Sequence, residues 1–284
     1  MIRFGPAGNS LSFAAKGHKT SLEVPEYLAE MGLNAFEYQC GRGVRISAAA
    51  GQLGEKARAF GIALSLHAPY YISMSSVEKE KRMGSLRYIL EAARAVSAMG
   101  GDRIVVHTGS CGSIPREEAL DLAVDTMKLA LAALDEEGLG HVRICPEVMG
   151  KVNQLGTLEE VLALCGVDPR LIPCVDFGHL NARTFGGLKG REDYAAVLDA
   201  MEETLGIQRA KAFHAHFSKI EYTAKGGEKK HLTFDDDIFG PDFAPLARLL
   251  AERDYSPTII CESAGTQAED AVAMQAMYEE AACT

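Results

Sequence analysis

A single (β/α)8 barrel is the fold class that this sequence of 284 residues predicts. Short apolar runs alternate along the chain with segments of helical period, and eight such units in about 250 residues are typical of this barrel. Most of the apolar runs also end in His, Asp or Glu, and active sites on this fold lie at the carboxyl ends of the strands. We therefore expect one domain over residues 1–284.

The first five expected strands cover residues 2–7, 35–39, 63–68, 103–107 and 142–147. Pro25 can begin the first helix, and Ser47 is expected to cap a second helix that runs to Phe60. A long helix of mixed charge is expected over residues 77–99. Pro115 opens the next helix, whose apolar residues keep a spacing of three and four, and Gly138 stops it.

The second half of the chain continues the alternation. Thr157 and Glu160 form a capping box for a helix, and a strand follows at residues 171–176. After a glycine-rich loop we expect a helix at 193–204, a strand at 211–218 and a polar loop that extends to Gly240. Pro241 is expected to start a helix, residues 257–262 form the last strand, and residues 267–280 form the last helix.

The composition indicates a globular protein. Hydrophobic residues make up 47% of the chain, no run of 18 apolar residues occurs, and the first residues lack the pattern of a signal peptide. We expect a cytoplasmic protein without a membrane partner. The seven cysteines include no C-x-x-C pair, so disulfides are not expected. A doubly wound open sheet is the main rival fold, but neither of its phosphate-binding glycine motifs occurs.

Six expected strands end in side chains that bind divalent metals. These residues are His67, His107, Glu147, Asp176, His214 and Glu262. Together they would bring three imidazoles and three carboxylates into one pocket, and three buried acids are costly unless cations neutralise them. Two metals with one bridging carboxylate would do so. A single histidine at a strand end is more often structural, but six such residues together favour a metal site.

Two further positions in the strands stay open. Because strand residues two apart share a face, His216 points the same way as His214, one layer nearer the rim. Glu37 in the second strand either joins the pocket or pairs with an arginine as a structural ion.

These residues resemble the endonuclease IV family of zinc-dependent apurinic/apyrimidinic endonucleases, in order and spacing, over essentially the whole chain. The segments that carry the resemblance are His67-Ala-Pro-Tyr-Tyr-Ile72, His107-Thr-Gly109, Glu147, Cys174-Val-Asp-Phe-Gly-His179, His214 with Ser218-Lys219, His231 and Glu262. The resemblance implies a barrel that cleaves DNA on the 5′ side of abasic sites, with damaged DNA as its partner and a metal-bound hydroxide as the nucleophile. Tyr70 matches a residue of the family's DNA-penetrating loop.

The resemblance also implies the ligands of two or three zinc ions, with manganese as a possible replacement. One ion would lie on His67, His107 and Glu147, and a second on the bridging Glu147 with Asp176, His214 and Glu262. A third would lie on His179 and His231.

The chain departs from the family pattern in its last third. Where the family has an Asp-x-His pair, this chain has Lys229-Lys230-His231, so the third site is either absent or completed by Glu228 or by an acid among 235–237. Where the family has His-x-Asn-Asp-Ser, this chain has His214-Ala-His-Phe-Ser218, which makes His216 an extra ligand or a proton carrier.

The formal net charge of −10 is unusual for a protein that binds duplex DNA. Lys219, Lys225, Lys229 and Lys230 lie in one expected loop, which is either a phosphate contact or a mobile basic loop. The sequence therefore favours metal-dependent phosphodiester or phosphate chemistry over DNA as such, and a small phosphorylated or sugar substrate is the alternative partner.

The alternative function is that of a divalent-metal sugar isomerase or epimerase of the xylose isomerase-like barrel group. In that group a Glu, Asp, His, Glu set holds one ion, and Glu147, Asp176, His214 and Glu262 would serve. The extra histidines His67, His107 and His231 favour the nuclease. A catalytically silent barrel used as a binding module is the third alternative, and it would leave the charged pocket without neutralising cations.

Overall fold

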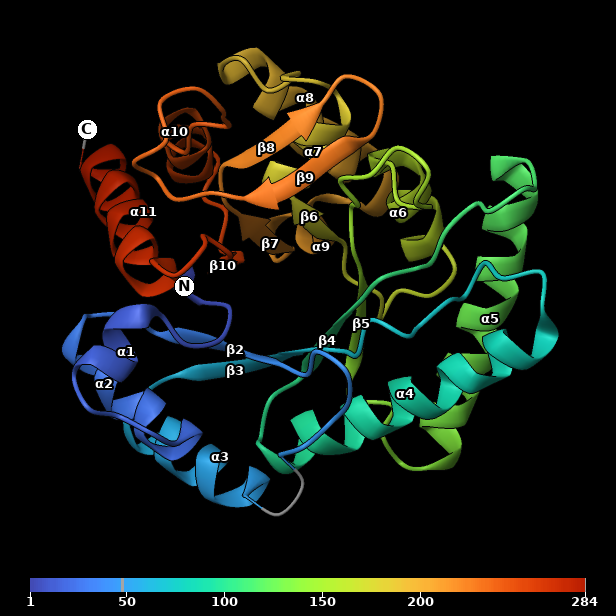
Figure 1. Cartoon of the computed structure of the whole chain (residues 1–284), viewed down its shortest axis with the longest axis horizontal. Helices are drawn as coiled ribbons and strands as arrows, with labels where there is room; N and C mark the ends of the chain where they lie inside the picture. Colours follow the sequence, from blue (N-terminus) through green and yellow to red (C-terminus); the bar gives the residue numbers. More distant parts are fainter. Residues whose placement is uncertain (47–48, 284) are drawn as a thin grey trace.

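The strands of this protein close into a parallel barrel. The computed structural model describes residues 1–46 and 49–283, and within them eight parallel strands alternate with helices around the outside (Figure 1). The strands are β1 (Arg3–Pro6), β2 (Ala35–Gln39), β3 (Ala63–His67), β4 (Arg103–Val106), β5 (Arg143–Pro146), β6 (Cys174–Asp176), β7 (His214–Phe217) and β10 (Thr258–Cys261). The predicted (β/α)8 fold is confirmed.

The barrel is closed by two isolated bridges. Strands β2-β3-β4-β5 form one sheet and β1-β10-β7-β6 form the other. Parallel bridges from Ala7 to Glu37 and from Glu147 to Cys174 join the two sheets at both seams. At the first seam, Gly5 lies so close to the carbonyl group of Ala35 that a Cβ atom would collide with it. All eight strands therefore point their carboxyl ends to one rim.

The helices pack on the outer face of the strands through apolar stripes. They are α1 (Leu11–Ala15), α2 (Val24–Glu30), α3 (Ala50–Ala59), α4 (Lys79–Ala98), α5 (Arg116–Glu136), α6 (Leu158–Cys165), α7 (Phe177–Arg183), α8 (Arg191–Leu205), α9 (Ile207–Lys211), α10 (Ala244–Glu252) and α11 (Gln267–Ala282), with a 3-10 turn at Ser21–Glu23. The predicted capping box of α6 is present, since Thr157 Oγ1 accepts from Glu160 N and the Glu160 carboxylate accepts from Thr157 N. The predicted cap Ser47 lies outside the described residues.

The structure contains two short helices that the sequence did not predict, α1 and α9, and α9 includes Lys211, the expected start of a strand. Two further differences lie close to the site. Asp176 caps α7 through the backbone N–H of His179, so His179 lies in a helix that starts directly at the strand end. The expected polar loop before Gly240 contains a hairpin of β8 (Ile220–Thr223) and β9 (Gly227–His231), and the next helix starts only at Ala244. The sequence did not predict these strands because β9 contains no large apolar residue and β8 alternates over only four residues.

The hairpin is docked on the loop that follows β5. Lys151 and Gly227 form an antiparallel bridge, and Glu228 N donates a hydrogen bond to Gly150 O at 3.1 Å. The guanidinium groups of Arg116 and Arg183 donate to backbone carbonyls of the same loop. The hairpin and the loop thus form one wall above the barrel rim.

Small and polar side chains fill the interior of the barrel. One apolar cluster there consists of Val105, Cys145, Ile172 and Cys174, and another of Ala7, Ala35 and Ile260. Buried polar residues lie above and between these clusters, and an apolar core would not need them. No helix among residues 1–46 and 49–283 has the length and apolar character needed to cross a bilayer.

Candidate metal centre

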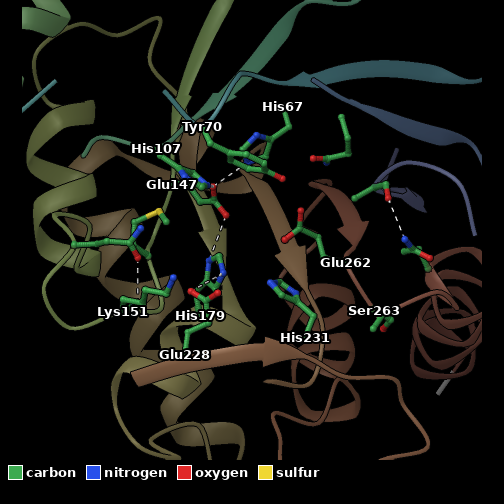
Figure 2. A pocket seen from close by; sticks show the side chains of 16 residues that line it. His67, Tyr70, His107, Glu147, Lys151, His179, Glu228, His231, Glu262 and Ser263 are labelled. Atoms are coloured by element: carbon green, nitrogen blue, oxygen red, sulfur yellow. Dashed lines mark hydrogen bonds and ion pairs between the residues drawn. The ribbon is translucent and has the colours of Figure 1, made fainter. Parts of the chain in front are cut away.

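A polar cavity of about 630 Å³ opens at the carboxyl ends of the strands. Figure 2 shows the imidazoles and carboxylates that line it, which come from the ends of β3, β4, β5 and β10, from α7 and from the β8–β9 hairpin. The labelled members are His67, Tyr70, His107, Glu147, Lys151, His179, Glu228, His231, Glu262 and Ser263. The predicted convergence of residues from separate strands is present in this cavity.

Glu147 is at the centre of the ligand arrangement, and each of its carboxylate oxygens faces a different group. Its Oε2 lies 3.3 Å from His67 Nε2 and 3.0 Å from His107 Nε2. Its Oε1 lies 3.1 Å from His216 Nδ1 and 3.3 Å from His179 Nδ1. The side chain is therefore placed to bridge two ions, as the sequence predicts for this residue.

The first ligand group consists of His67, His107 and Glu147, whose ligand atoms lie within 4.8 Å of one another. His67 Nδ1 lies 2.9 Å from the carbonyl oxygen of Ala68, and because a carbonyl only accepts, Nδ1 carries the proton. The lone pair of neutral His67 is then on Nε2, which faces Glu147. This tautomer is the one that can bind a metal inside the cavity.

The second group consists of Glu147, Asp176, His216 and Glu262. His216 Nδ1 lies 3.6 Å from Glu262 Oε2 and 3.9 Å from Asp176 Oδ2. His214, the ligand expected from the sequence, is one layer deeper and binds Glu37 through Nε2 at 2.9 Å. Both histidines face the barrel interior, as the alternation of the strand predicts, but the one nearer the rim belongs to this group.

The third group consists of His179, Glu228 and His231. His179 Nδ1 is 3.1 Å from the carbonyl oxygen of Val148, and its Nε2 is 3.6 Å from Glu228 Oε2. His231 Nδ1 is 2.9 Å from Ser218 Oγ. Of the open alternatives for this site, Glu228 is the acid that lies with the two histidines.

Lys229 does not occupy the third group. It is exposed on β9, and its ammonium group pairs with the carboxylate of Glu221, as does that of Lys230 at 3.3 Å. Lys219 is half-buried and donates to the backbone carbonyls of Phe234 and Asp236. Three of the four lysines of the expected basic loop thus have structural partners outside the cavity, and Lys151 is the lysine that lines it.

The electrostatics of the pocket fit bound cations. Burial raises the pKa of Asp176, whose Oδ2 atom has no hydrogen-bond partner among the described residues. Burial also acts to raise the pKa of Glu147, but the charge of His107 and hydrogen bonds from His107, His179 and His216 hold that pKa well below its usual value. Burial acts to lower the pKa of His179, but the Asp176 and Glu147 carboxylates raise it overall, to about 10. Protonated imidazoles offset the charge of these carboxylates, and divalent metals bound in place of those protons would do the same.

Tyr70 stands at the rim of the cavity with a half-exposed ring. The ring centroid is 5.6 Å from that of His67 and 5.5 Å from that of His107. Burial and the nearby Glu262 and Glu147 carboxylates raise its pKa, so the hydroxyl is neutral at physiological pH. The ring therefore offers a stacking surface beside the first ligand group.

Two residues of the site could not be assigned from the sequence. Glu37 is fully buried beneath the cavity, where it contacts Ser65, His214 and His216, so it does not form the arginine pair that was one of its two alternatives, and it does not line the cavity either. Lys151 and its loop carried no strand-end pattern. The signal that could have placed Glu37 is the alternation in its strand, because Ala35, Glu37 and Gln39 share one face.

Known proteins similar to this chain include both nucleases and sugar epimerases. An uncharacterized protein of Methanocaldococcus jannaschii is 30% identical over 282 residues, which cover 99% of this chain and 98% of that protein. A probable endonuclease 4 of Acholeplasma laidlawii is 28% identical over 174 residues, 60% of this chain, and the match spans only 57% of that protein.

Solved structures share the fold. A D-tagatose 3-epimerase-like protein has a TM-score of 0.73 at 20% identity, covering 99% of this chain and 98% of that one. Endonuclease IV of Thermus thermophilus has a TM-score of 0.66 at 18% identity, covering 98% of this chain and 99% of that one. Residues 25–280 match the family described as "Xylose isomerase-like TIM barrel". With its closed parallel barrel and its ligands at the strand ends, the chain belongs to the xylose isomerase-like TIM barrel family, whose members include endonuclease IV.

Proposed function

We propose that this protein is a zinc-dependent phosphodiester hydrolase of the endonuclease IV type. The observation that carries the proposal is Glu147, whose two oxygens face two separate ligand groups. A third group lies in the same cavity, so the pocket offers ligands for more than the single ion that a sugar isomerase needs. Bound metals would supply Lewis-acid stabilisation of phosphate oxygens and activation of water.

The chain's own residues would bind and orient the substrate. Lys151 lines the cavity and offers an ammonium group to a phosphate oxygen. Tyr70 presents its ring face at the rim, where a base or a sugar can stack. His67, His107 and Glu147 line the same cavity as these two residues, so a phosphate held by Lys151 and flanked by Tyr70 would share the cavity with the first ligand group.

A DNA substrate is the finer part of the proposal, and the charge of the chain sets its limits. With a formal net charge of −10, affinity for duplex DNA would depend on the metals and on few basic side chains. A small phosphate diester meets the same cavity without that electrostatic cost. We expect cleavage of both kinds of substrate, with the activity on duplex DNA falling more steeply as salt increases.

The test uses the full chain, loaded with zinc or with manganese. Metal analysis should return at least two ions per chain, and a duplex with one abasic site should be nicked on its 5′ side. Bis(p-nitrophenyl) phosphate tests diester hydrolysis without DNA. Glu147→Gln should abolish both activities. A single bound ion together with no cleavage of either substrate would contradict the proposal.

A sugar epimerase is the second candidate, supported by the group of Glu147, Asp176, His216 and Glu262. This group can hold one divalent ion by itself, and the amides of Gln39, Gln154 and Gln267 line the same cavity and could bind sugar hydroxyls. The variant His107→Ala separates the two functions, because it removes a ligand of the first group and leaves the second group complete. Ketose epimerisation that survives this change, with no diester hydrolysis in the unchanged chain, would favour the epimerase.

A further inference from the structure

Beneath the second ligand group lies a carboxylate that the proposed reaction does not use. Glu37 is on β2, where it shares its inward face with Ala35, and the side chain is 0% exposed. Among the described residues no lysine or arginine pairs with it. Ser65 Oγ donates to its Oε2 at 2.9 Å and Gln39 Nε2 donates to its Oε1 at 3.2 Å. A buried carboxylate without a cationic partner of its own is costly, so its other contacts need a reason.

Those other contacts are two histidines of β7, one on each carboxylate oxygen. His214 Nε2 lies 2.9 Å from Oε2, and His216 Nε2 lies 2.9 Å from Oε1. The contact with His216 is an ion-pair distance rather than an aligned hydrogen bond.

His216 therefore lies between two carboxylate layers. Its Nε2 faces Glu37 below, and its Nδ1 faces Glu147 Oε1 above, at 3.1 Å. A histidine ring that gives one nitrogen to a carboxylate has its other nitrogen fixed as the metal ligand. This arrangement assigns Nδ1 of His216 to the second ligand group.

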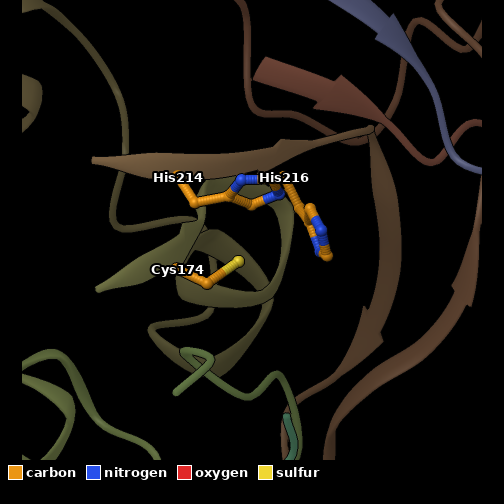
Figure 3. A group of neighbouring side chains, drawn as sticks. All are labelled: Cys174, His214 and His216. Atoms are coloured by element: carbon orange, nitrogen blue, oxygen red, sulfur yellow. The ribbon is translucent and has the colours of Figure 1, made fainter. Parts of the chain in front are cut away.

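His214 and Cys174 complete the layer in a different way. Figure 3 shows Cys174, His214 and His216 together, and their ligand atoms lie within 4.8 Å of one another. Cys174 also packs in the apolar cluster with Val105, Cys145 and Ile172. The thiol thus acts as a packing residue, while His214 contacts the second oxygen of Glu37.

We propose that Glu37 is the positioning residue for the metal ligand His216, which it orients through Nε2 so that Nδ1 is presented to Glu147, Asp176 and Glu262. The inference rests on the metal centre of the proposed function. It also explains why His216 and not His214 is the ligand. His214 lies deeper and holds the Glu37 carboxylate, and that carboxylate orients His216.

The test is a zinc titration of full-length Glu37→Gln by calorimetry and by competition with a chelator. We expect one ion to bind about 10- to 100-fold more weakly, as changes in groups that orient ligands usually cause, and the other ions to bind as before. Adding Glu37→Gln to His216→Ala should cause no further loss. Asp270→Asn is the matched control, because Asp270 is a buried acid that accepts from Phe234 N and Thr266 Oγ1 away from the ligands.

A measurement on the unchanged chain keeps the test independent of folding. Nitrogen-15 NMR of the cadmium-loaded protein should show cadmium coupling at Nδ1 of His216 and a proton on Nε2. Coupling at Nε2, or a sulfur ligand in the X-ray absorption spectrum, would overturn the inference, and so would unchanged affinity in a folded Glu37→Gln. If the unchanged chain binds no metal, the proposed function fails together with this inference. If the unchanged chain binds metal and a folded Glu37→Gln binds it equally well, only this inference fails.

Discussion

Gly150 and Glu228 are in direct contact across the wall above the barrel rim. A Cβ atom added to Gly150 would lie 2.6 Å from Glu228 Cβ and 2.9 Å from His179 Cδ2. On the other side, a Cβ atom on Gly227 would collide with the carbonyl oxygen of Gly150, and Gly227 has a φ of 74°. The hairpin can bring its carboxylate to His179 because both contact points lack side chains.

Replacing Gly150 with alanine should therefore displace Glu228 and weaken the third ligand group. We expect a destabilisation of about 1–3 kcal/mol from overpacking and the loss of one ion per chain. Metal analysis and thermal unfolding measure the two effects. Gly84→Ala is the control, because Gly84 is in α4 with open space around it, and there alanine should stabilise by about 1 kcal/mol.

The third group should depend on Glu228 and not on Lys229. Glu228→Gln removes a charged ligand beside His179 and His231, so the chain should bind one ion fewer. Lys229→Ala breaks only an exposed pair with Glu221 and should keep every ion. Metal content after dialysis against a fixed free zinc concentration compares the two variants. Equal metal content in Glu228→Gln and the unchanged chain would remove Glu228 from the site.

Removal of metal should lower the thermal stability of the chain. Bound ions would neutralise Glu147, Asp176 and Glu262, and Asp176 Oδ2 accepts no hydrogen bond from any described residue. At free metal roughly a thousandfold above Kd, binding adds about 4 kcal/mol, which corresponds to a shift in Tm on the order of 10 °C. Unfolding scans with and without a chelator measure the shift. A chelator that leaves Tm unchanged in a metal-loaded sample would contradict the prediction.

Tyr70 should contribute to substrate binding and not to metal binding. Its half-exposed ring lies against His67 and His107, and Tyr70 contributes no atom to the three ligand groups. Tyr70→Ala should raise KM on the order of tenfold through the loss of one stacking surface. Tyr70→Phe should keep KM close to that of the unchanged chain, and metal content should be the same in all three proteins. A loss of metal in Tyr70→Ala would show a structural role instead.

The ion pair of Arg116 with Glu160 should make stability depend on acid pH. Burial acts to raise the pKa of Glu160, but hydrogen bonds from Arg116 and from the N–H groups of Gly156 and Thr157 lower it overall. Because the folded-state pKa is below the unfolded value, this contribution is present above about pH 4.5 and is lost as the pH falls further.

Glu160→Gln measures that contribution. At pH 7 we expect it to lower the free energy of unfolding by about 1–2 kcal/mol, and the difference from the unchanged chain should shrink below pH 4. Urea unfolding at pH 7 and at pH 3.5 gives both values. A difference that stays constant over this range would mean that Glu160 acts through packing and not through its charge.

The barrel could be predicted from the sequence because two signals indicated the same fold. Apolar runs alternate with segments of helical period, and most of these runs end in His, Asp or Glu. The capping box of Thr157 and Glu160 and the bounds of β2 were correct, since local hydrogen bonds and alternation determine them. The β8–β9 hairpin was not predicted because β8 is short, β9 is polar on both faces, and the position of the hairpin depends on docking against Gly150. Local pattern carries no information about such tertiary contacts.

The sequence predicted which strands carry the ligands, but not always which residue of the strand is the ligand. Alternation placed His214 and His216 on one face, yet only the depth of the barrel decides which of them meets Glu147. That depth depends on the register between β6 and β7, where Asp176 is opposite His216 and Cys174 is opposite His214. A sequence without a partner strand cannot give that register.

The ligands of this centre belong to two kinds of support. Those on β3 to β7, at the end of β10 and on α7 are held by the closed barrel, whereas Glu228 and His231 come from an appended hairpin that packs on α7 and on the loop after β5. A hairpin that moved away from this loop and from α7 would withdraw two donors together and leave the strand-borne ligands in place. The number of ions that the protein carries can therefore change in a single step without rebuilding the barrel.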